Sequence, residues 1–155
     1  LICMLRRFAL HEEEETRTAS LPQLPRADFS NKRILLAEDN LLNQEIARTL
    51  LQNTRAHVET AADGREAVEM FAASFTGYYD LIFMDIQMPL MDGYQATRRI
   101  RAMNRPDAAT IPIVAMTANA FTEDIKLAMD AGMKQHMAKP IDIRQLETIL
   151  YRWLG

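Results

Sequence analysis

Five polar side chains that could do chemistry together stand at the ends of short apolar runs. Glu38 and Asp39 follow the first such run, Asp85 the third, Thr117 the fourth and Lys139 the fifth. Taken singly, each has an ordinary explanation as a cap, a turn residue or a solvated side chain. Taken together, carboxylates that can act as nucleophiles and metal ligands, a hydroxyl and an ammonium group suit the handling of a phosphoryl group.

The apolar runs before these residues have the composition of β-strands. Their apolarity is continuous rather than alternating, which is typical of strands buried on both faces of a parallel sheet. The second run is shorter than the others, and the fifth is the weakest. The sequence predicts five strands, at residues 34–37, 57–61, 81–84, 111–116 and 133–138.

Five amphipathic helices are predicted between and after these strands. Residue types that favour N-caps precede four of them, at Asn40, Asp63, Asp92 and Asp142, and Gly132 closes the remaining one. The apolar positions at helical spacing are Leu42, Ile46 and Leu50; Ala67, Met70 and Phe71; Ala96, Ile100 and Met103; Ile125, Ala128 and Met129; and Leu146, Ile149, Leu150 and Trp153.

This strict alternation predicts an α/β fold, a doubly wound five-stranded parallel sheet with helices on both faces. The carboxyl ends of parallel strands meet at one edge, so the polar groups at four strand ends should face one crevice. Three carboxylates there would repel one another and raise a pKa unless cations are present. All-oxygen ligands favour Mg²⁺ as that cation, with Lys139 as a second positive group.

Composition narrows the function further. The chain has 155 residues, of which 48% are hydrophobic and 25% are charged. Its net charge is −3, and it has no cluster of Lys and Arg that would indicate binding to nucleic acid. Its single cysteine, Cys3, cannot form an internal disulfide, and no apolar run approaches the roughly 18 residues of a membrane span. These features predict a cytoplasmic domain without membrane contact of its own. Residues 1–31, with an acidic run and two prolines, are interpreted as a linker or a remnant of a longer chain, and residues 32–155 as one domain.

Four motifs carry a resemblance to a known family. LLAEDN, LIFMDIQMPLMDG, IVAMTAN and KP, in this order, resemble the receiver domain of two-component response regulators, over residues 33–154. The resemblance implies a flavodoxin-like sheet with strand order 2-1-3-4-5. It also implies that the domain takes a phosphoryl group from phosphohistidine and changes conformation, rather than acting as an enzyme on other molecules.

The resemblance assigns roles residue by residue. Asp85 resembles the phosphoacceptor; Glu38 and Asp39, with Asp85 itself and the Gln87 backbone carbonyl, resemble the Mg²⁺ ligands. Thr117, the Ala118 backbone N–H and Lys139 resemble the groups that contact the phosphoryl oxygens. Gly93 resembles the tight-turn glycine after the acceptor, and the peptide from Lys139 to Pro140 would be cis.

One position departs from the family pattern. Where the family usually carries Tyr or Phe, three residues before the lysine, this chain has His136. Thr117 and His136 are therefore the expected switch residues, although His136 is equally well explained as a half-buried strand histidine without a special role. Phosphorylation itself should not depend on this position.

The resemblance also implies partners and an origin. The motifs look most like the receivers of hybrid sensor histidine kinases, so a histidine kinase or a histidine phosphotransfer domain is the expected partner, and weak self-association is left open. The domain would then be cytoplasmic, or tethered to a membrane-bound sensor kinase. A stand-alone response regulator is the main alternative.

Other classes with an aspartate at a strand end fit less well. Asp-nucleophile phosphatases need a second acid two residues after the first, and here that residue is Gln87. Nucleotide binding lacks a glycine-rich loop after the first strand. A receiver that has lost its chemistry and serves only as a binding surface would not keep all five key side chains.

Overall fold

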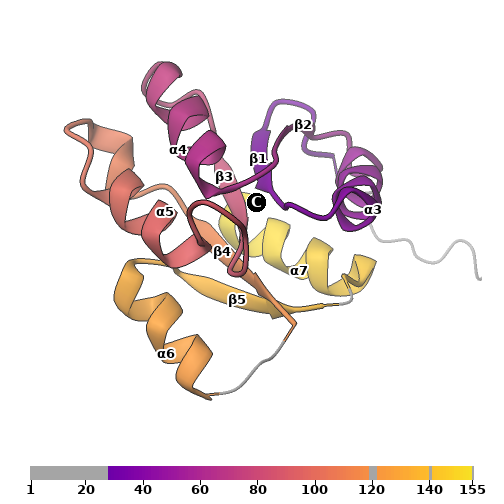
Figure 1. Cartoon of the computed structure of the whole chain (residues 1–155). Helices are drawn as coiled ribbons and strands as arrows, with labels where there is room; N and C mark the ends of the chain where they lie inside the picture. The colour runs from indigo at the N-terminus through magenta and orange to yellow at the C-terminus, as the bar shows by residue number, and fades with distance from the viewer. Residues whose placement is uncertain (1–27, 119–121, 140, 155) are drawn as a thin grey trace, which may run out of the picture.

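The computed structural model describes residues 28–118, 122–139 and 141–154, and in these ranges it is one α/β layer structure (Figure 1). Its five parallel strands have the order β2-β1-β3-β4-β5, which confirms the predicted topology. The strands are β1 (Arg33–Ala37), β2 (His57–Ala61), β3 (Leu81–Asp85), β4 (Ile113–Thr117) and β5 (Gln135–Ala138).

The helices alternate with the strands as the sequence predicts. Asn40, Asp63 and Asp92 accept hydrogen bonds from backbone N–H groups of the first turns that follow them, so three of the predicted N-caps are confirmed. The helices are α3 (Leu41–Gln52), α4 (Gly64–Ala73), α5 (Gly93–Arg101), α6 (Thr122–Ala131) and α7 (Ile143–Leu154), with a 3-10 turn η1 (Pro106–Ala108) before β4.

Two apolar layers hold the sheet between its helices. On one face, β-strand residues pack with Phe71 of α4, Ile100 of α5 and Ala128 of α6. On the other face they pack with Leu51 of α3 and Ile149 of α7. Figure 1 shows the same division, with α4, α5 and α6 on one side of the sheet and α3 and α7 on the other. Because β3 and β4 are buried along their whole length, whatever stands at their ends is held rigidly.

The side of α3 that meets the sheet is not the one that carries the apolar positions named from the sequence. Leu42 and Ile46 are 69% and 45% exposed, and the buried residues of the helix are Ala47 and Leu51. The helix is apolar on more than one side, and the sheet is contacted by the side that carries the small Ala47. An exposed apolar surface is therefore left at the start of α3.

Residues 28–31 belong to the segment interpreted as a linker, yet Phe29 is buried. Its backbone N–H donates to the Thr54 carbonyl over 2.9 Å, and its ring meets that of Tyr151 edge to face at 5.4 Å. The rest of the segment lies outside the described residues, so its role as a linker stays a prediction. No helix in the described part of the chain is both long and apolar enough to span a membrane.

Candidate functional site: an acidic crevice at the carboxyl edge of the sheet

The carboxyl ends of four strands surround a hollow of about 370 Å³. The structure brings together the five side chains that the sequence singled out, because β1, β3, β4 and β5 all end at this edge. The lining residues are Glu38, Asp39, Asn40, Asn43, Asp85, Ile86, Gln87, Thr117, Ala118 and Lys139.

Lys139 joins two of the carboxylates. Its Nζ lies 3.0 Å from Glu38 Oε1 and 3.1 Å from Asp85 Oδ2. Both acids are nearly inaccessible, since 1% of the Glu38 side chain and 6% of the Asp85 side chain are exposed. A buried carboxylate without a positive partner would be strongly destabilising, so Lys139 is a structural part of this site rather than a solvated surface residue.

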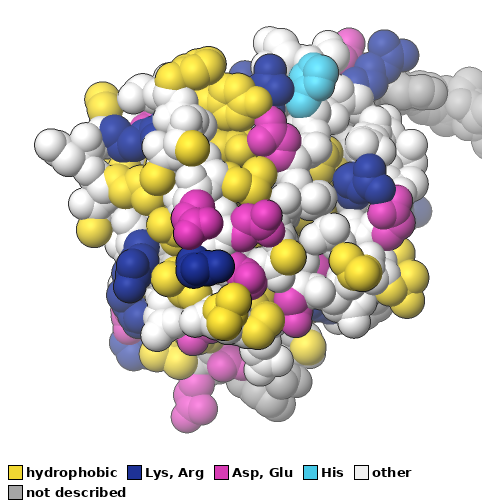
Figure 2. All heavy atoms as spheres, turned by 45° about the horizontal axis from the view of Figure 1, so that its top comes forward, with side chains coloured by type: hydrophobic (Ala, Val, Ile, Leu, Met, Phe, Trp, Pro, Cys, Tyr) yellow, Lys and Arg dark blue, Asp and Glu magenta, His cyan; other side chains and the backbone are white. Residues whose placement is uncertain are grey.

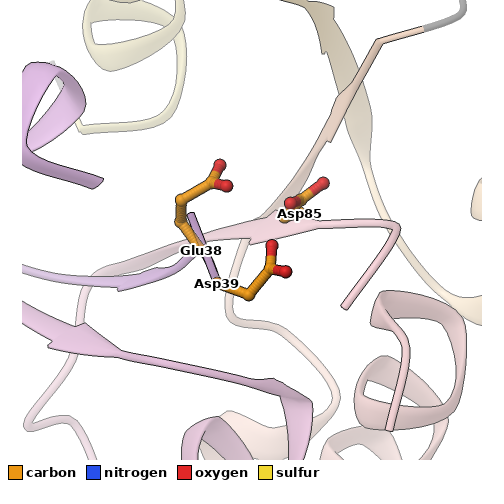
Figure 3. A group of neighbouring side chains, drawn as sticks. All are labelled: Glu38, Asp39 and Asp85. Carbon is orange, nitrogen blue, oxygen red and sulfur yellow. The ribbon is translucent and has the colours of Figure 1, made fainter. Parts of the chain in front are cut away.

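The third carboxylate, Asp39, completes an acidic cluster. Ligand oxygens of Glu38, Asp39 and Asp85 all lie within 4.8 Å of one another. Figure 3 shows these side chains around the ends of β1 and β3, with their carboxylates turned toward one region. Three carboxylates facing one ammonium leave an excess of negative charge, and hard oxygen ligands with room for water are what Mg²⁺ prefers. The donor set therefore fits a Mg²⁺ ion.

Electrostatics in the crevice perturb two groups. Burial, and after it the negative charge of Glu38, raise the pKa of Asp85 to about 6, although Lys139 and the Gln87 N–H oppose this rise. Burial by itself lowers the pKa of Lys139, but its contacts with Glu38 and Asp85 outweigh that effect and raise the pKa above its ordinary value. At neutral pH the crevice therefore holds an ionised aspartate beside a firmly protonated lysine.

Backbone groups hold the two buried acids in place. The Asn40 N–H donates to Glu38 Oε2 over 3.2 Å, and the Gln87 N–H donates to Asp85 Oδ1 over 3.3 Å. The Gln87 carbonyl, predicted as a metal ligand, lies on the same loop, and its role stays a prediction.

The two expected switch residues, Thr117 and His136, occupy different places. Thr117 ends the buried strand β4 and lines the crevice together with Ala118. His136 lies outside the crevice: it is half-buried on β5, paired with Ala115 of β4. Neighbours in a parallel pair point to the same face, so His136 lies on the α6 side of the sheet. Pro140 lies outside the described residues, and the cis peptide predicted there stays a prediction.

Gly93 is needed for close approach. It is the first residue of α5, its N–H donates to the Ile86 carbonyl over 2.9 Å, and a Cβ there would overlap the backbone carbonyl of Asp85. The left-handed residue of this loop is instead Leu90, at φ 66°, which is also 78% exposed. The loop therefore turns at Leu90 and packs back under Asp85 at Gly93.

Two features near the crevice could not be predicted from the sequence: a hydrogen bond made by Gln44 and the exposed apolar surface at the start of α3. The Gln44 side chain donates to the Glu38 carbonyl over 2.9 Å from the first turn of α3. A polar residue in a helical pattern carries no signal for this contact, which depends on how α3 returns over the end of β1.

Comparisons with known proteins agree with this geometry. The family model of the response regulator receiver domain matches residues 34–151. Probable histidine kinase 2 of Oryza sativa subsp. indica is 44% identical over 124 residues, which cover 73% of this chain and 12% of the rice protein. The chain thus spans a small part of this relative.

Solved structures give the same result. The receiver domain of the sensor histidine kinase PA1611 from Pseudomonas aeruginosa PAO1, with a magnesium ion coordinated in its active-site cleft, has a TM-score of 0.72 and 40% identity, covering 80% of this chain and 98% of that one. The receiver domain of Saccharomyces cerevisiae Ssk1, crystallised with the histidine phosphotransfer protein Ypd1, has a TM-score of 0.71 and 30% identity. The match covers 79% of this chain and 88% of that one.

Proposed function

This chain belongs to the response regulator receiver domain family, and from that premise we propose that it accepts a phosphoryl group from phosphohistidine on the Asp85 carboxylate. The observation that carries the proposal is the position of Asp85. It stands at the end of a fully buried strand, with its Oδ2 3.1 Å from Lys139 Nζ. Its carboxylate also lies close to those of Glu38 and Asp39. A nucleophile held this rigidly beside a cation suits an in-line transfer.

The transfer itself is a displacement at phosphorus. An Asp85 oxygen attacks, the new O–P bond forms as the N–P bond to the donor imidazole breaks, and the imidazole leaves with a proton from solvent. Lys139, the Thr117 hydroxyl and the Ala118 N–H bind the equatorial oxygens as charge builds up on them. Glu38, Asp39, Asp85 and the Gln87 carbonyl would hold Mg²⁺, which when bound offsets the negative charge that an incoming phosphoryl group meets.

Incubation with radiolabelled acetyl phosphate tests this function. We expect one phosphoryl group per chain in the presence of Mg²⁺ and almost none with a chelator, because three uncompensated carboxylates repel the anionic donor. Labelling that is equally fast in the chelator would contradict the role of the acidic cluster.

We further propose that the domain comes from a hybrid sensor histidine kinase. One relative is a probable histidine kinase, and this chain covers 12% of its length. The proposal therefore includes histidine kinase activity in the parent protein and a cytoplasmic location near its sensor. A stand-alone response regulator is the alternative. The domain's own chemistry would be limited to gaining and losing its phosphoryl group.

The partner proposed for this chemistry is a histidine phosphotransfer domain or a kinase, as Ypd1 is crystallised with Ssk1. Any such donor must cover the mouth of the crevice, because its histidine has to reach Asp85. Asn43 in the first turn of α3 lines the crevice, and the neighbouring apolar side chains of the same helix are exposed, Leu41 by 75%, Leu42 by 69% and Ile46 by 45%. Figure 2 shows hydrophobic side chains at the surface beside acidic ones on the face it presents. We therefore place the donor over the start of α3.

Replacing Leu42 and Ile46 together by serine tests this docking surface. Transfer from a histidine phosphotransfer protein that phosphorylates the parent domain should slow about tenfold, because buried apolar anchors dominate such interfaces. Labelling by acetyl phosphate, which needs no docking, should not change. The matched control is a variant in which Leu127 and Met129, two exposed apolar residues of α6, are both replaced by serine. Equal slowing in the control, or none in the α3 variant, would place the donor elsewhere.

The signal would leave through Thr117 and His136. We propose that Thr117 moves toward the phosphoryl oxygens and that His136, on the α6 side of β5, takes the space released, which shifts a two-state population.

A further inference from the structure

Both metal acids at the end of β1 are carried by a very short link. Residues 38–40 alone separate β1 from α3, and Glu38 and Asp39 are two of these three. Whatever fixes the backbone of this link also fixes the two carboxylates.

The two acids are not held equally well. Glu38 has Lys139 at 3.0 Å and the Asn40 N–H at 3.2 Å. Asp39 is exposed, and among residues 28–118, 122–139 and 141–154 no hydrogen bond or ion pair is found for its carboxylate. The direction of Asp39 is therefore set by the backbone from which it projects.

One side chain clamps that backbone. Gln44 Nε2 donates to the Glu38 carbonyl over 2.9 Å and approaches the Ala61 carbonyl at 3.5 Å. Ala61 ends the neighbouring strand β2, and its carbonyl also accepts from the Glu38 N–H over 3.0 Å. The Gln44 amide thus ties the first turn of α3 to the ends of two strands, immediately beneath the link that carries Asp39.

We propose that Gln44 is a positioning residue for Mg²⁺ binding. By holding the Glu38 carbonyl, it fixes the peptide that joins Glu38 to Asp39, so that the Asp39 carboxylate faces the cluster before the ion arrives. Without the clamp the link can rotate, and ordering it again would oppose binding. The inference rests on the proposed Mg²⁺-dependent function, and it adds a residue outside the metal ligands to the site.

Three variants test it by titration calorimetry with MgCl₂ on the whole chain. Gln44→Met keeps the length of the side chain but removes both donors, so the Mg²⁺ dissociation constant should rise about tenfold, as is usual when a group that orients a ligand is lost. Gln44→Arg keeps donors but adds a positive charge. Gln52→Met, at the exposed end of the same helix, is the control and should bind like the parent.

The order of affinities separates the clamp from simple electrostatics. Charge alone predicts that the arginine variant binds Mg²⁺ more weakly than the methionine variant, whereas the clamp predicts the reverse. Urea unfolding in a chelator accompanies each titration, so that a variant with fewer folded molecules is recognised and its titration is corrected to the folded fraction. A methionine variant that binds as tightly as the parent, or better than the arginine variant, overturns the inference. A parent that binds no Mg²⁺ would instead contradict the proposed function.

Discussion

An Asp85→Asn variant is expected to take up no phosphoryl group from acetyl phosphate or from a phosphohistidine donor. The amide is nearly the same size and can keep the Gln87 N–H contact, but it lacks the anionic oxygen that attacks phosphorus. Labelling should therefore fall to background while the fold is retained.

The matched control is Asp130→Asn. Asp130 is exposed on α6, where it forms an i,i+4 ion pair with Lys126, so its loss should leave labelling unchanged. Uptake by the Asp85 variant at the parent rate would mean that another residue is the acceptor.

The same substitution is expected to stabilise the metal-free domain at neutral pH. The pKa of Asp85 is about 6 in the folded chain, against 3.8 for an unperturbed aspartate. A carboxyl whose pKa is raised by folding favours the folded state below pH 3.8, and this contribution is lost as the pH rises through about 6. At about pH 7.5 the ionised group then costs up to roughly 3 kcal/mol of stability, which an asparagine does not.

Urea unfolding of the parent and the Asp85→Asn variant in a chelator measures this effect. The variant should be the more stable by about 1–3 kcal/mol at about pH 7.5. The difference should shrink toward about pH 4, where Asp85 is protonated in the folded state and about half protonated in the unfolded state. A gap that is the same at both pH values would show that burial of the Asp85 charge is not its cause.

The positions of the key residues could be predicted from the sequence because parallel strands impose a simple rule. Continuous apolar runs indicate strands inside the sheet, as β1, β3 and β4 are, and the carboxyl ends of parallel strands lie at one edge. Asp85, Thr117 and Lys139 are far apart in the chain, yet they line one crevice for this reason alone. The order of the strands came from the family resemblance and is confirmed.

Side-chain direction within elements was harder to predict. The start of α3 is apolar on several sides, and helical spacing does not say which side meets the sheet. The structure buries Ala47 and Leu51 and exposes Leu42 and Ile46, so two of the apolar positions that indicated the helix form the proposed docking surface. A pattern of apolar residues cannot separate a core face from a binding face when both occur on one helix.

Contacts that depend on register could not be predicted at all. Gln44 meets the carbonyls of Glu38 and Ala61 only because β1 and β2 pair with Ala37 opposite Ala61. Leu90 adopts a left-handed conformation for which its residue type gives no indication. Both features follow from the assembled fold rather than from local propensity.

The role of Asp85 as phosphoacceptor is tested most directly by locating the phosphoryl group in the parent chain. After labelling with acetyl phosphate and Mg²⁺, treatment with borohydride converts an aspartyl phosphate into a stable alcohol, and peptide mass spectrometry then identifies the modified residue. We expect the reduced residue to be Asp85, the modification to be absent when Mg²⁺ is chelated, and Glu38 and Asp39 to be unmodified. A modification found on another residue, or on Asp85 equally with and without Mg²⁺, would contradict this expectation.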